Sequence, residues 1–335
     1  TDRPIRPLFP ENYRNDVQIN NMLLSADGQN DSDMLSIVAA SAALTISEIP
    51  FMGPVAGVRV GRIDGKFVIN PTHDERIKSD IDLVYAAGKE LPQMIEGSAR
   101  EVPEADMVAA MRAGHEECLK LIEAQLELRR KLGLPEKTVE ESPGDTSLLT
   151  EAKETAGTEL ADALLISGKI EREKRVKEIH DSLKKELLEK HEDMTDEEFR
   201  SAFDDLEIET VRTNLLEKGK RIDGRSMDDV RPLNAQVGLL PRSHGSALFD
   251  RGETQALATV TLGTKSDKQN LDAVTGGIEE KAFMLHYNFP PYCVGECGRL
   301  GFTSRREIGH GALAERSLLE VVPQNYPYTI RLVSD

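Results

Sequence analysis

Apolar residues recur at helical spacing through residues 104–131, and polar residues fill the positions between them. A helix has 3.6 residues per turn, so apolar side chains three, four or seven positions apart share one face. The members of this face are Met107, Met111, Cys118, Ile122 and Leu126. The pattern predicts one amphipathic helix over residues 104–131.

Residues 1–100 mix short β signals with turns. The turn dipeptide Asp64-Gly65 is followed by the apolar run 67–69 and preceded by Val58, Val60 and Ile63. An Asp-Gly pair between two such runs is typical of a β-hairpin. The last third of the chain has a similar texture, with Gly-rich turns and β-branched runs such as residues 256–262.

The middle of the chain has a second helical pattern, separated from the first by Ser142-Pro143-Gly144. One apolar stripe consists of Val176, Ile179, Leu183 and Leu187. A further helix is predicted to begin after Thr195, because Thr195 and Glu198 have the spacing of a capping box. We therefore expect a small helical bundle whose many charged side chains lie on solvated faces.

A short internal repeat relates the two ends of the chain. The segment 10–13 (Pro-Glu-Asn-Tyr) recurs as 323–326 (Pro-Gln-Asn-Tyr), 313 positions further on. The same offset pairs Arg3 with Arg316, Val17 with Ile330 and Ile19 with Leu332. Two copies of one fold would explain the repeat, whereas coincidence over a short segment is the alternative.

Composition is that of a globular protein of two or three domains, with 335 residues, a mass of 37.1 kDa and 39% hydrophobic residues. No apolar run approaches the roughly 18 residues of a membrane span, and no cleavable leader is visible. A cytoplasmic location is therefore expected. Because the chain opens at Thr1 without Met and stops inside an apparent strand, we expect it to be a piece of a longer protein.

Charge and cysteine usage limit the possible partners. The net charge of −17 argues against a polyanion, but residues 136–217 alone hold 24 acidic and 12 basic residues, so the rest is close to neutral. The three cysteines are too few for a disulfide framework, and no second ligand pair accompanies Cys293 and Cys297. We expect no zinc site and no other metal ligands in this chain.

Several motifs of the last third occur in a fixed order. They are residues 221–225 (Arg-Ile-Asp-Gly-Arg), 243–255 (Ser-His-Gly-Ser-Ala-Leu-Phe-Asp-Arg-Gly-Glu-Thr-Gln), 285–291 (Leu-His-Tyr-Asn-Phe-Pro-Pro) and 305–311 (Arg-Arg-Glu-Ile-Gly-His-Gly). With residues 3–10 near the start, they resemble the polynucleotide phosphorylase family over nearly the whole chain. Asp250 departs from the Thr expected there.

This resemblance implies an α+β fold, with two partial RNase PH-type domains (ribosomal protein S5 domain 2-like) joined by an all-α domain. The expected boundaries are 1–131 for the C-terminal part of the first RNase PH domain, 132–217 for the helical linker and 218–335 for the N-terminal part of the second. The implied function is a polyribonucleotide nucleotidyltransferase, a phosphate-dependent 3′-to-5′ exoribonuclease that releases nucleoside diphosphates reversibly. Single-stranded RNA, inorganic phosphate, a homotrimeric ring and RNA-degradosome proteins are the partners it implies.

Arg305, Arg306 and His310 are the expected catalytic residues. Two adjacent guanidinium groups suit phosphate oxygens and precede a segment that could open a helix, although adjacent arginines more often form a solvated face. Their place in the family motif favours contact with RNA or phosphate near the reacting 3′ end. His310 would contact phosphate in the same pocket, and a core histidine is the alternative.

Four further arginines are predicted to bind substrate: Arg251, Arg316, Arg3 and Arg6. Arg251 follows an apparent strand at a Gly turn, where a side chain can reach a ligand. A structural salt bridge with Glu253 or a neighbour is an equal alternative for Arg251. The run 288–291 is more typical of a turn than of chemistry, since consecutive prolines offer no donors.

The resemblance also implies Mg²⁺ or Mn²⁺, with the metal ligands and phosphate loop downstream of Asp335. In the first copy, residues 79–84 resemble the metal-binding strand, but Val84 replaces the Lys and Arg76 replaces an Asp, which leaves Asp82 alone. We therefore predict that the first domain is catalytically silent and that this chain alone is inactive. The rival functions are a non-catalytic RNA-binding ring subunit of an exosome-like assembly and a hydrolytic RNase.

Overall fold

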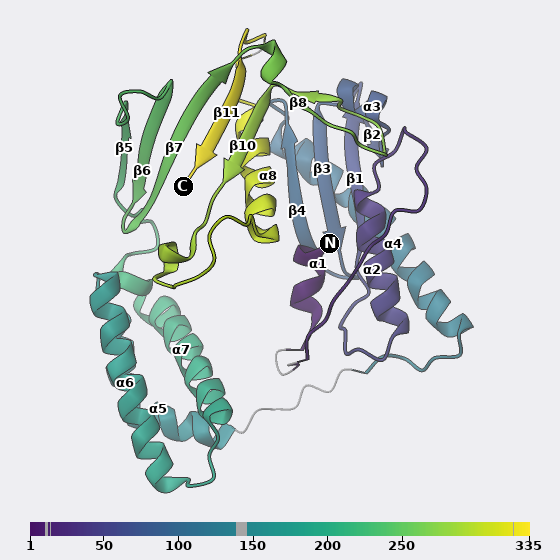
Figure 1. Cartoon of the computed structure of the whole chain (residues 1–335). Coiled ribbons are helices and arrows are strands. Elements are labelled where there is room, and N and C mark those ends of the chain that lie inside the picture. The colour runs from purple at the N-terminus through teal and green to yellow at the C-terminus, as the bar shows by residue number, and fades with distance from the viewer. Residues whose placement is uncertain (11–12, 14, 139–145, 324) are drawn as a thin grey trace. The chain divides into compact units, whose positions relative to one another are not determined.

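The computed structural model describes the chain outside residues 11–12, 14, 139–145 and 324. Its fold is α+β, as expected, and it divides into two compact units (Figure 1). The described residues of 1–141, 237–247 and 257–335 form the first unit, and those of 142–236 and 248–256 form the second.

A four-stranded antiparallel sheet with the order β2-β1-β3-β4 lies in the first unit. Its strands are β1 (Ala56–Ile63), β2 (Lys66–Ile69), β3 (Ile81–Ala87) and β4 (Pro92–Ala99). The predicted hairpin is confirmed, because Ile63 pairs with Lys66 across the turn. Asp64 and Gly65 adopt φ values of 50° and 76° there, the left-handed conformation that suits this dipeptide.

One face of this sheet is covered by α4 (Glu104–Lys131), whose bounds match the predicted helix. Cys118 and Ile122 are buried and pack with Val58 and Leu83 of the strands. The Cys118 thiol lies 3.5 Å from the Ala56 carbonyl oxygen. The apolar stripe of α4 is therefore the face of the helix that packs on the sheet, as its 3.6-residue period predicts.

Alternate residues of β3 point to the other side of the strand, since side chains alternate along a strand. Val84 and Ala86 are buried there with Ile37 and Leu44 of α2. The helical elements of this region are α1 (Asp2–Ile5), η1 (Arg6–Leu8), α2 (Asp33–Ile46) and α3 (His73–Lys78). Strand β3 is thus buried on both sides.

A second, five-stranded sheet has the order β10-β11-β7-β6-β5. Strand β11 pairs with β10 in parallel and with β7 antiparallel, and β7 contains the β-branched run predicted at 256–262. The strands are β5 (Leu233–Val237), β6 (Gly245–Arg251), β7 (Thr254–Gly263), β10 (Phe283–Tyr287) and β11 (Thr329–Ser334). Shorter elements are β8 (Gln269–Asn270), β9 (Glu280–Lys281), η2 (Ile222–Gly224), η3 (Lys265–Asp267) and η4 (Pro291–Val294).

Helix α8 (Arg305–Leu319) lies beside β10 (Figure 1). Glu315 joins the two elements: its carboxylate accepts a hydrogen bond from the Leu285 backbone N–H at 3.1 Å and pairs with Lys281 at 2.6 Å. These contacts fix the helix against the strand that leads into the Asn288 to Pro291 turn.

The second unit contains the predicted helical bundle, formed by α5 (Thr146–Ala163), α6 (Lys169–Lys190) and α7 (Asp196–Lys218). Its core holds Ile179, Leu183 and Leu187 of the predicted stripe. The Thr195 capping box is present at the start of α7, as predicted. The predicted break at 142–144 lies outside the described residues. None of the described helices is long and apolar enough to cross a membrane.

The repeat relates segments of different structure. Ile330 and Leu332 belong to β11, whereas their counterparts Val17 and Ile19 lie in a segment without strand pairing among the described residues. Strand β11 is held by neighbours on both sides, and pairing of this kind is what makes an extended segment a strand. Glu11, Asn12 and Gln324 of the repeated motif lie outside the described residues.

Candidate active site

The start of α8 places two of the predicted catalytic residues. Ser304 caps the helix: its hydroxyl accepts from the Glu307 N–H at 3.2 Å, and the Glu307 carboxylate accepts from the Ser304 N–H at 2.6 Å. Arg305 and Arg306 are therefore the first two helical residues, and both are exposed. Free backbone N–H groups and the helix dipole favour an anion at this end, and two guanidinium groups add to that preference.

Glu307 also fixes the turn after β10. Its second carboxylate oxygen accepts a hydrogen bond from the Phe289 backbone N–H at 2.7 Å. The hydrogen bonds from Phe289 and then Ser304 lower the pKa of Glu307, so the carboxylate stays ionised near neutral pH. One side chain thus holds both the turn and the helix start.

Three aromatic rings form a row that begins beside Arg306. The Arg306 guanidinium carbon is 5.3 Å from the centroid of the Phe289 ring. Phe289 stacks on Tyr287 with centroids 6.2 Å apart and planes 11° apart, and Tyr287 lies 5.5 Å from His310. His310 is exposed, so its interpretation as a core histidine is wrong. The structure brings Arg305, Arg306 and His310 together on one helix.

The two arginines have no carboxylate partner in the described part of the chain. Among the described residues, neither Arg305 nor Arg306 forms a hydrogen bond or an ion pair. Exposed guanidinium groups without a carboxylate partner are available for bidentate contacts with phosphate oxygens. This arrangement can bind and neutralise a phosphate or a nucleic-acid backbone.

Arg251 is the last residue of β6 and is exposed. The alternative of a salt bridge with Glu253 is not seen, because the Glu253 carboxylate accepts from the Lys169 backbone N–H at 3.1 Å. Within the part of the chain that the structure describes, Arg251 forms no hydrogen bond or ion pair. Its predicted role in substrate binding stays a prediction.

Three other predicted arginines lie against carboxylates. Arg3 contacts Glu96 at 2.5 Å, Arg316 binds the other oxygen of the same carboxylate, and Arg6 pairs with Asp2 at 2.6 Å. Burial lowers the pKa of Arg316. Arg3 and Arg316, which the repeat equates, thus share one partner on β4. Their binding of substrate stays a prediction, because these contacts engage the guanidinium groups within the protein.

A network of ion pairs surrounds Asp82 of β3, the strand of the first sheet that resembles the family's metal-binding strand. Arg59 binds both Asp33 and Asp82, and Arg76 binds Asp31 and, at 2.9 Å, Asp82. Burial, the largest influence, raises the pKa of Asp82, but the charges and hydrogen bonds of the two arginines outweigh it and leave this pKa lowered. Asp82 is therefore held as a carboxylate between two guanidinium groups.

This network does not fit a magnesium ion. Mg²⁺ needs free carboxylate oxygens in near-octahedral geometry, and both Asp82 oxygens are taken by Arg59 and Arg76. No group of three or more His, Cys, Asp or Glu side chains among the described residues is arranged to hold a metal ion. Asp82 is therefore a partner of these two arginines rather than a metal ligand.

Sequence reasoning missed several of these residues. Phe289 lies in the motif 285–291 and Glu307 in the motif 305–311, but nothing in the sequence indicated the hydrogen bond between them. Asp31, Asp33 and Arg59 had no signal in the sequence. Arg59 pairs with Asp33, 26 positions away, and Arg76 pairs with Asp31, 45 positions away, so residue spacing could not indicate these contacts. The spacing of Phe289, two positions after Tyr287, could have suggested that the two rings lie on the same side of the chain.

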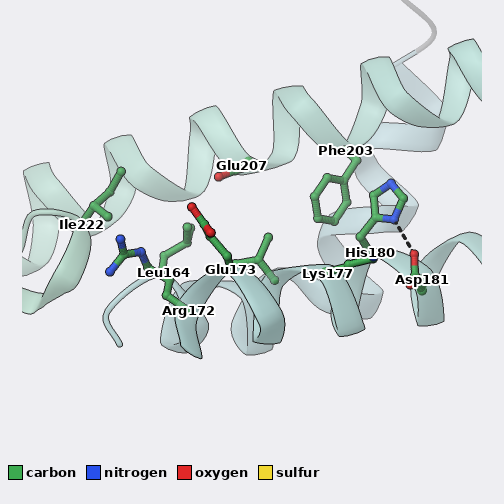
Figure 2. Close-up of a pocket in the computed structure, with 10 residues that line it drawn as sticks. Leu164, Arg172, Glu173, Lys177, His180, Asp181, Phe203, Glu207 and Ile222 are labelled. Atoms are coloured by element: carbon green, nitrogen blue, oxygen red, sulfur yellow. Dashed lines mark hydrogen bonds and ion pairs between the residues drawn. The ribbon is translucent and has the colours of Figure 1, made fainter. Parts of the chain in front are cut away.

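A separate cavity of about 510 Å³ lies in the helical unit, between α6 and α7 (Figure 2). Its apolar lining consists of Leu164, Val176, Phe203 and Ile222. Arg172 also lines it, but its guanidinium donates to the Ile166 carbonyl at 2.8 Å. Burial raises the pKa of Glu207 on the opposite helix. The described residues that line this cavity include no pair of arginines available for an anion, so it does not resemble a phosphate site.

Sequence comparisons identify the class of protein. The model of the 3′ exoribonuclease family, domain 1, matches residues 1–50 and 229–335. Domain 2 of the same family matches residues 53–117, and the RNA binding domain of polyribonucleotide nucleotidyltransferase matches residues 147–226. One domain model matching both ends of the chain agrees with two copies of one fold.

Curated relatives narrow this class. Polyribonucleotide nucleotidyltransferases of Methylacidiphilum infernorum, Geotalea daltonii and Geobacter sulfurreducens are 49%, 48% and 47% identical to the chain over 336 aligned residues. Each alignment covers 100% of this chain and 48% of the relative. The chain belongs to the polyribonucleotide nucleotidyltransferase family, and it spans about half the length of the curated relatives it matches.

Proposed function

We propose that the chain is part of a phosphate-dependent 3′-to-5′ exoribonuclease, a polyribonucleotide nucleotidyltransferase. The observation that carries the proposal is the unpaired Arg305 and Arg306 at the start of α8, with His310 on the same helix. The names of the matching families and relatives point to the same reaction. The substrate is single-stranded RNA and the co-substrate is inorganic phosphate.

In the proposed reaction, an oxygen of inorganic phosphate attacks the phosphorus of the last internucleotide linkage. The bond from phosphorus to the 3′ oxygen of the preceding nucleotide breaks, and that oxygen takes up the proton of the attacking hydrogen phosphate. The products are a nucleoside diphosphate and a shortened RNA with a 3′ hydroxyl. Negative charge grows on the phosphoryl oxygens in the transition state, and Arg305 and Arg306 stabilise it as charge-assisted donors. His310 contacts phosphate beside them.

The assembly and its setting complete the proposal. Domains 1–131, 132–217 and 218–335 belong to two RNase PH units and a helical linker, which agrees with the helical bundle at 146–218. The complete enzyme forms a cytoplasmic homotrimer, uses Mg²⁺ or Mn²⁺ and takes part in mRNA catabolism, in contact with RNA-degradosome proteins. When bound, the metal supplies positive charge to the phosphoryl group, and its ligands are not among the residues of the first sheet.

A phosphate-dependence assay tests the function. The complete enzyme is incubated with an RNA that has a single-stranded 3′ end, with and without inorganic phosphate, and the released nucleotide is identified by mass. Nucleoside diphosphates that appear only with phosphate support the proposal. Nucleoside monophosphates without phosphate would indicate a hydrolytic RNase, and RNA binding without release would indicate a non-catalytic ring subunit.

A further inference from the structure

The stack of Tyr287 and Phe289 supports two of the proposed site residues at once. Arg306 lies against Phe289, and His310 lies against Tyr287. Arg306 and His310 are four positions apart on α8, so they share one face of the helix. Tyr287 ends β10, and the two rings are nearly parallel at 11°. The stacked rings therefore form a common support for both residues.

This contact restricts the Arg306 side chain. A guanidinium over an aromatic face is attracted by the ring quadrupole, and its planar shape stacks where an ammonium would not. Glu307 fixes the backbone on both sides of the contact, through the N–H groups of Phe289 and Ser304 at 2.7 and 2.6 Å. Because the ring and the helix start are joined by one carboxylate, Arg306 is pre-oriented before any ligand arrives.

Arg305 differs from its neighbour. Across the described residues it has no hydrogen bond, ion pair or aromatic contact, and it is also exposed. Its long side chain keeps its rotamer freedom and must lose that freedom on binding. The two adjacent arginines are therefore unequal: one is held on a ring and the other is free.

We propose that Tyr287 and Phe289 are positioning residues that hold Arg306 and His310 for substrate phosphate, whereas Arg305 is left free to follow the moving RNA. This inference rests on the proposed function. It assigns turnover mainly to the held Arg306 and its ring, and RNA affinity mainly to the free Arg305. A rigid donor needs no reorganisation as charge develops, which is the advantage of holding it.

A pair of double-mutant cycles in the complete enzyme tests this division. Phe289→Leu is combined with Arg306→Ala in one cycle and with Arg305→Ala in the other, and both kcat and KM for RNA phosphorolysis are measured. A ring contact of this kind predicts that Phe289→Leu lowers kcat about two- to thirtyfold. The loss should vanish when Arg306 is already Ala, persist when Arg305 is Ala, and be restored by Phe289→Tyr.

Lysine substitutions test the same contact without changing the ring. Arg306→Lys keeps the charge but loses the planar contact, so it should lower kcat more than Arg305→Lys, which is its matched control. This comparison decides the matter if Phe289→Leu fails to fold, as judged by its melting curve. Equal losses from the two lysine variants, or an effect of Phe289→Leu that is independent of Arg306, would overturn the inference.

A binding readout separates this inference from the proposed function. The same variants are titrated with a short single-stranded RNA, and the coupling between Phe289 and Arg306 is calculated from the Kd values. An enzyme that releases no nucleoside diphosphate would refute the proposed function, while coupling in the Kd values would still support the positioning of Arg306. Active enzyme without coupling in kcat or Kd would refute the positioning alone.

Discussion

Two pairs of arginines occupy the two RNase PH parts of this chain in opposite ways. Arg59 and Arg76 in the first part are bound by aspartates, and Arg59 is almost completely buried. Arg305 and Arg306 at the start of α8 are exposed and have no carboxylate partner among the described residues, and Arg306 lies against the Phe289 ring. A guanidinium bound to carboxylates stabilises the fold, whereas one without them can bind an anionic ligand. The partners, rather than the residue type, decide the role.

The largest expected effect is on the exposed pair. Replacing Arg305 and Arg306 together by Ala should lower phosphorolysis by the complete enzyme about 10² to 10⁴-fold, since each charged hydrogen-bonding group contributes roughly 1.5–3 kcal/mol. Circular dichroism should remain unchanged because both side chains are exposed. Arg130→Ala on α4 removes a surface pair with Glu123 and is the control. Wild-type rates in the folded double variant would show that this pair has no role.

The buried arginine should instead govern stability. Arg59→Met leaves Asp82 and Asp33 without their shared partner, and breaking a buried ion pair costs about 3–5 kcal/mol of the free energy of unfolding. Urea denaturation measures this loss. Arg6→Met, which removes the exposed pair with Asp2, should cost less than about 1 kcal/mol. Similar losses in the two variants would remove the distinction between the buried and the exposed pairs.

Asp82 tests whether the first part is catalytically silent. Asp82→Ala should leave phosphorolysis almost intact in the complete enzyme while lowering the free energy of unfolding by about 1–3 kcal/mol, because the buried Arg59 loses one carboxylate partner and keeps Asp33. Loss of activity in a folded Asp82→Ala enzyme would contradict the assignment of turnover to the second copy.

The pH dependence of stability gives a second test of Asp82. Its pKa in the folded protein is lowered from 3.8, so the carboxylate contributes stability that is complete above pH 3.8. That contribution is lost as the pH falls through the lowered folded pKa. Asp82→Asn should therefore flatten the loss of stability below about pH 4, as measured by denaturation at several pH values.

The smallest expected effect compares two helix caps. Ser304→Ala and Thr195→Ala each remove a capping box and should each cost about 1 kcal/mol of stability. Only Ser304→Ala should also slow phosphorolysis, because α8 presents Arg305 and Arg306 at that cap. If the two variants are equally active, the Ser304 cap does not determine how Arg305 and Arg306 are positioned for the reaction.

Local patterns in the sequence predicted the elements that depend on neighbouring residues. The helix at 104–131, the hairpin at Asp64-Gly65 and the Thr195 cap were all confirmed. Each of these follows from residue spacing within a few positions, where helical or strand period and turn chemistry act directly. These features required no knowledge of the tertiary structure.

Contacts between distant parts of the chain were not predictable in this way. The repeat equated Arg3 with Arg316, but it did not reveal that both bind Glu96. The repeat also equated Val17 with a strand residue, although strand formation depends on partners that spacing does not encode. The family motif singled out Arg305, Arg306 and His310, while the stacked rings, of which Phe289 contacts Arg306, became visible only in three dimensions.

Cys118 lies on the buried face of α4, against the first sheet, and can therefore report on unfolding. Burial raises the pKa of this thiol to about 12, whereas Cys293 and Cys297 are exposed. An alkylating reagent attacks the thiolate, so the folded protein should consume two equivalents quickly and the third only when α4 lifts from the first sheet. The rate of that third modification therefore measures the opening of the first RNase PH part by itself.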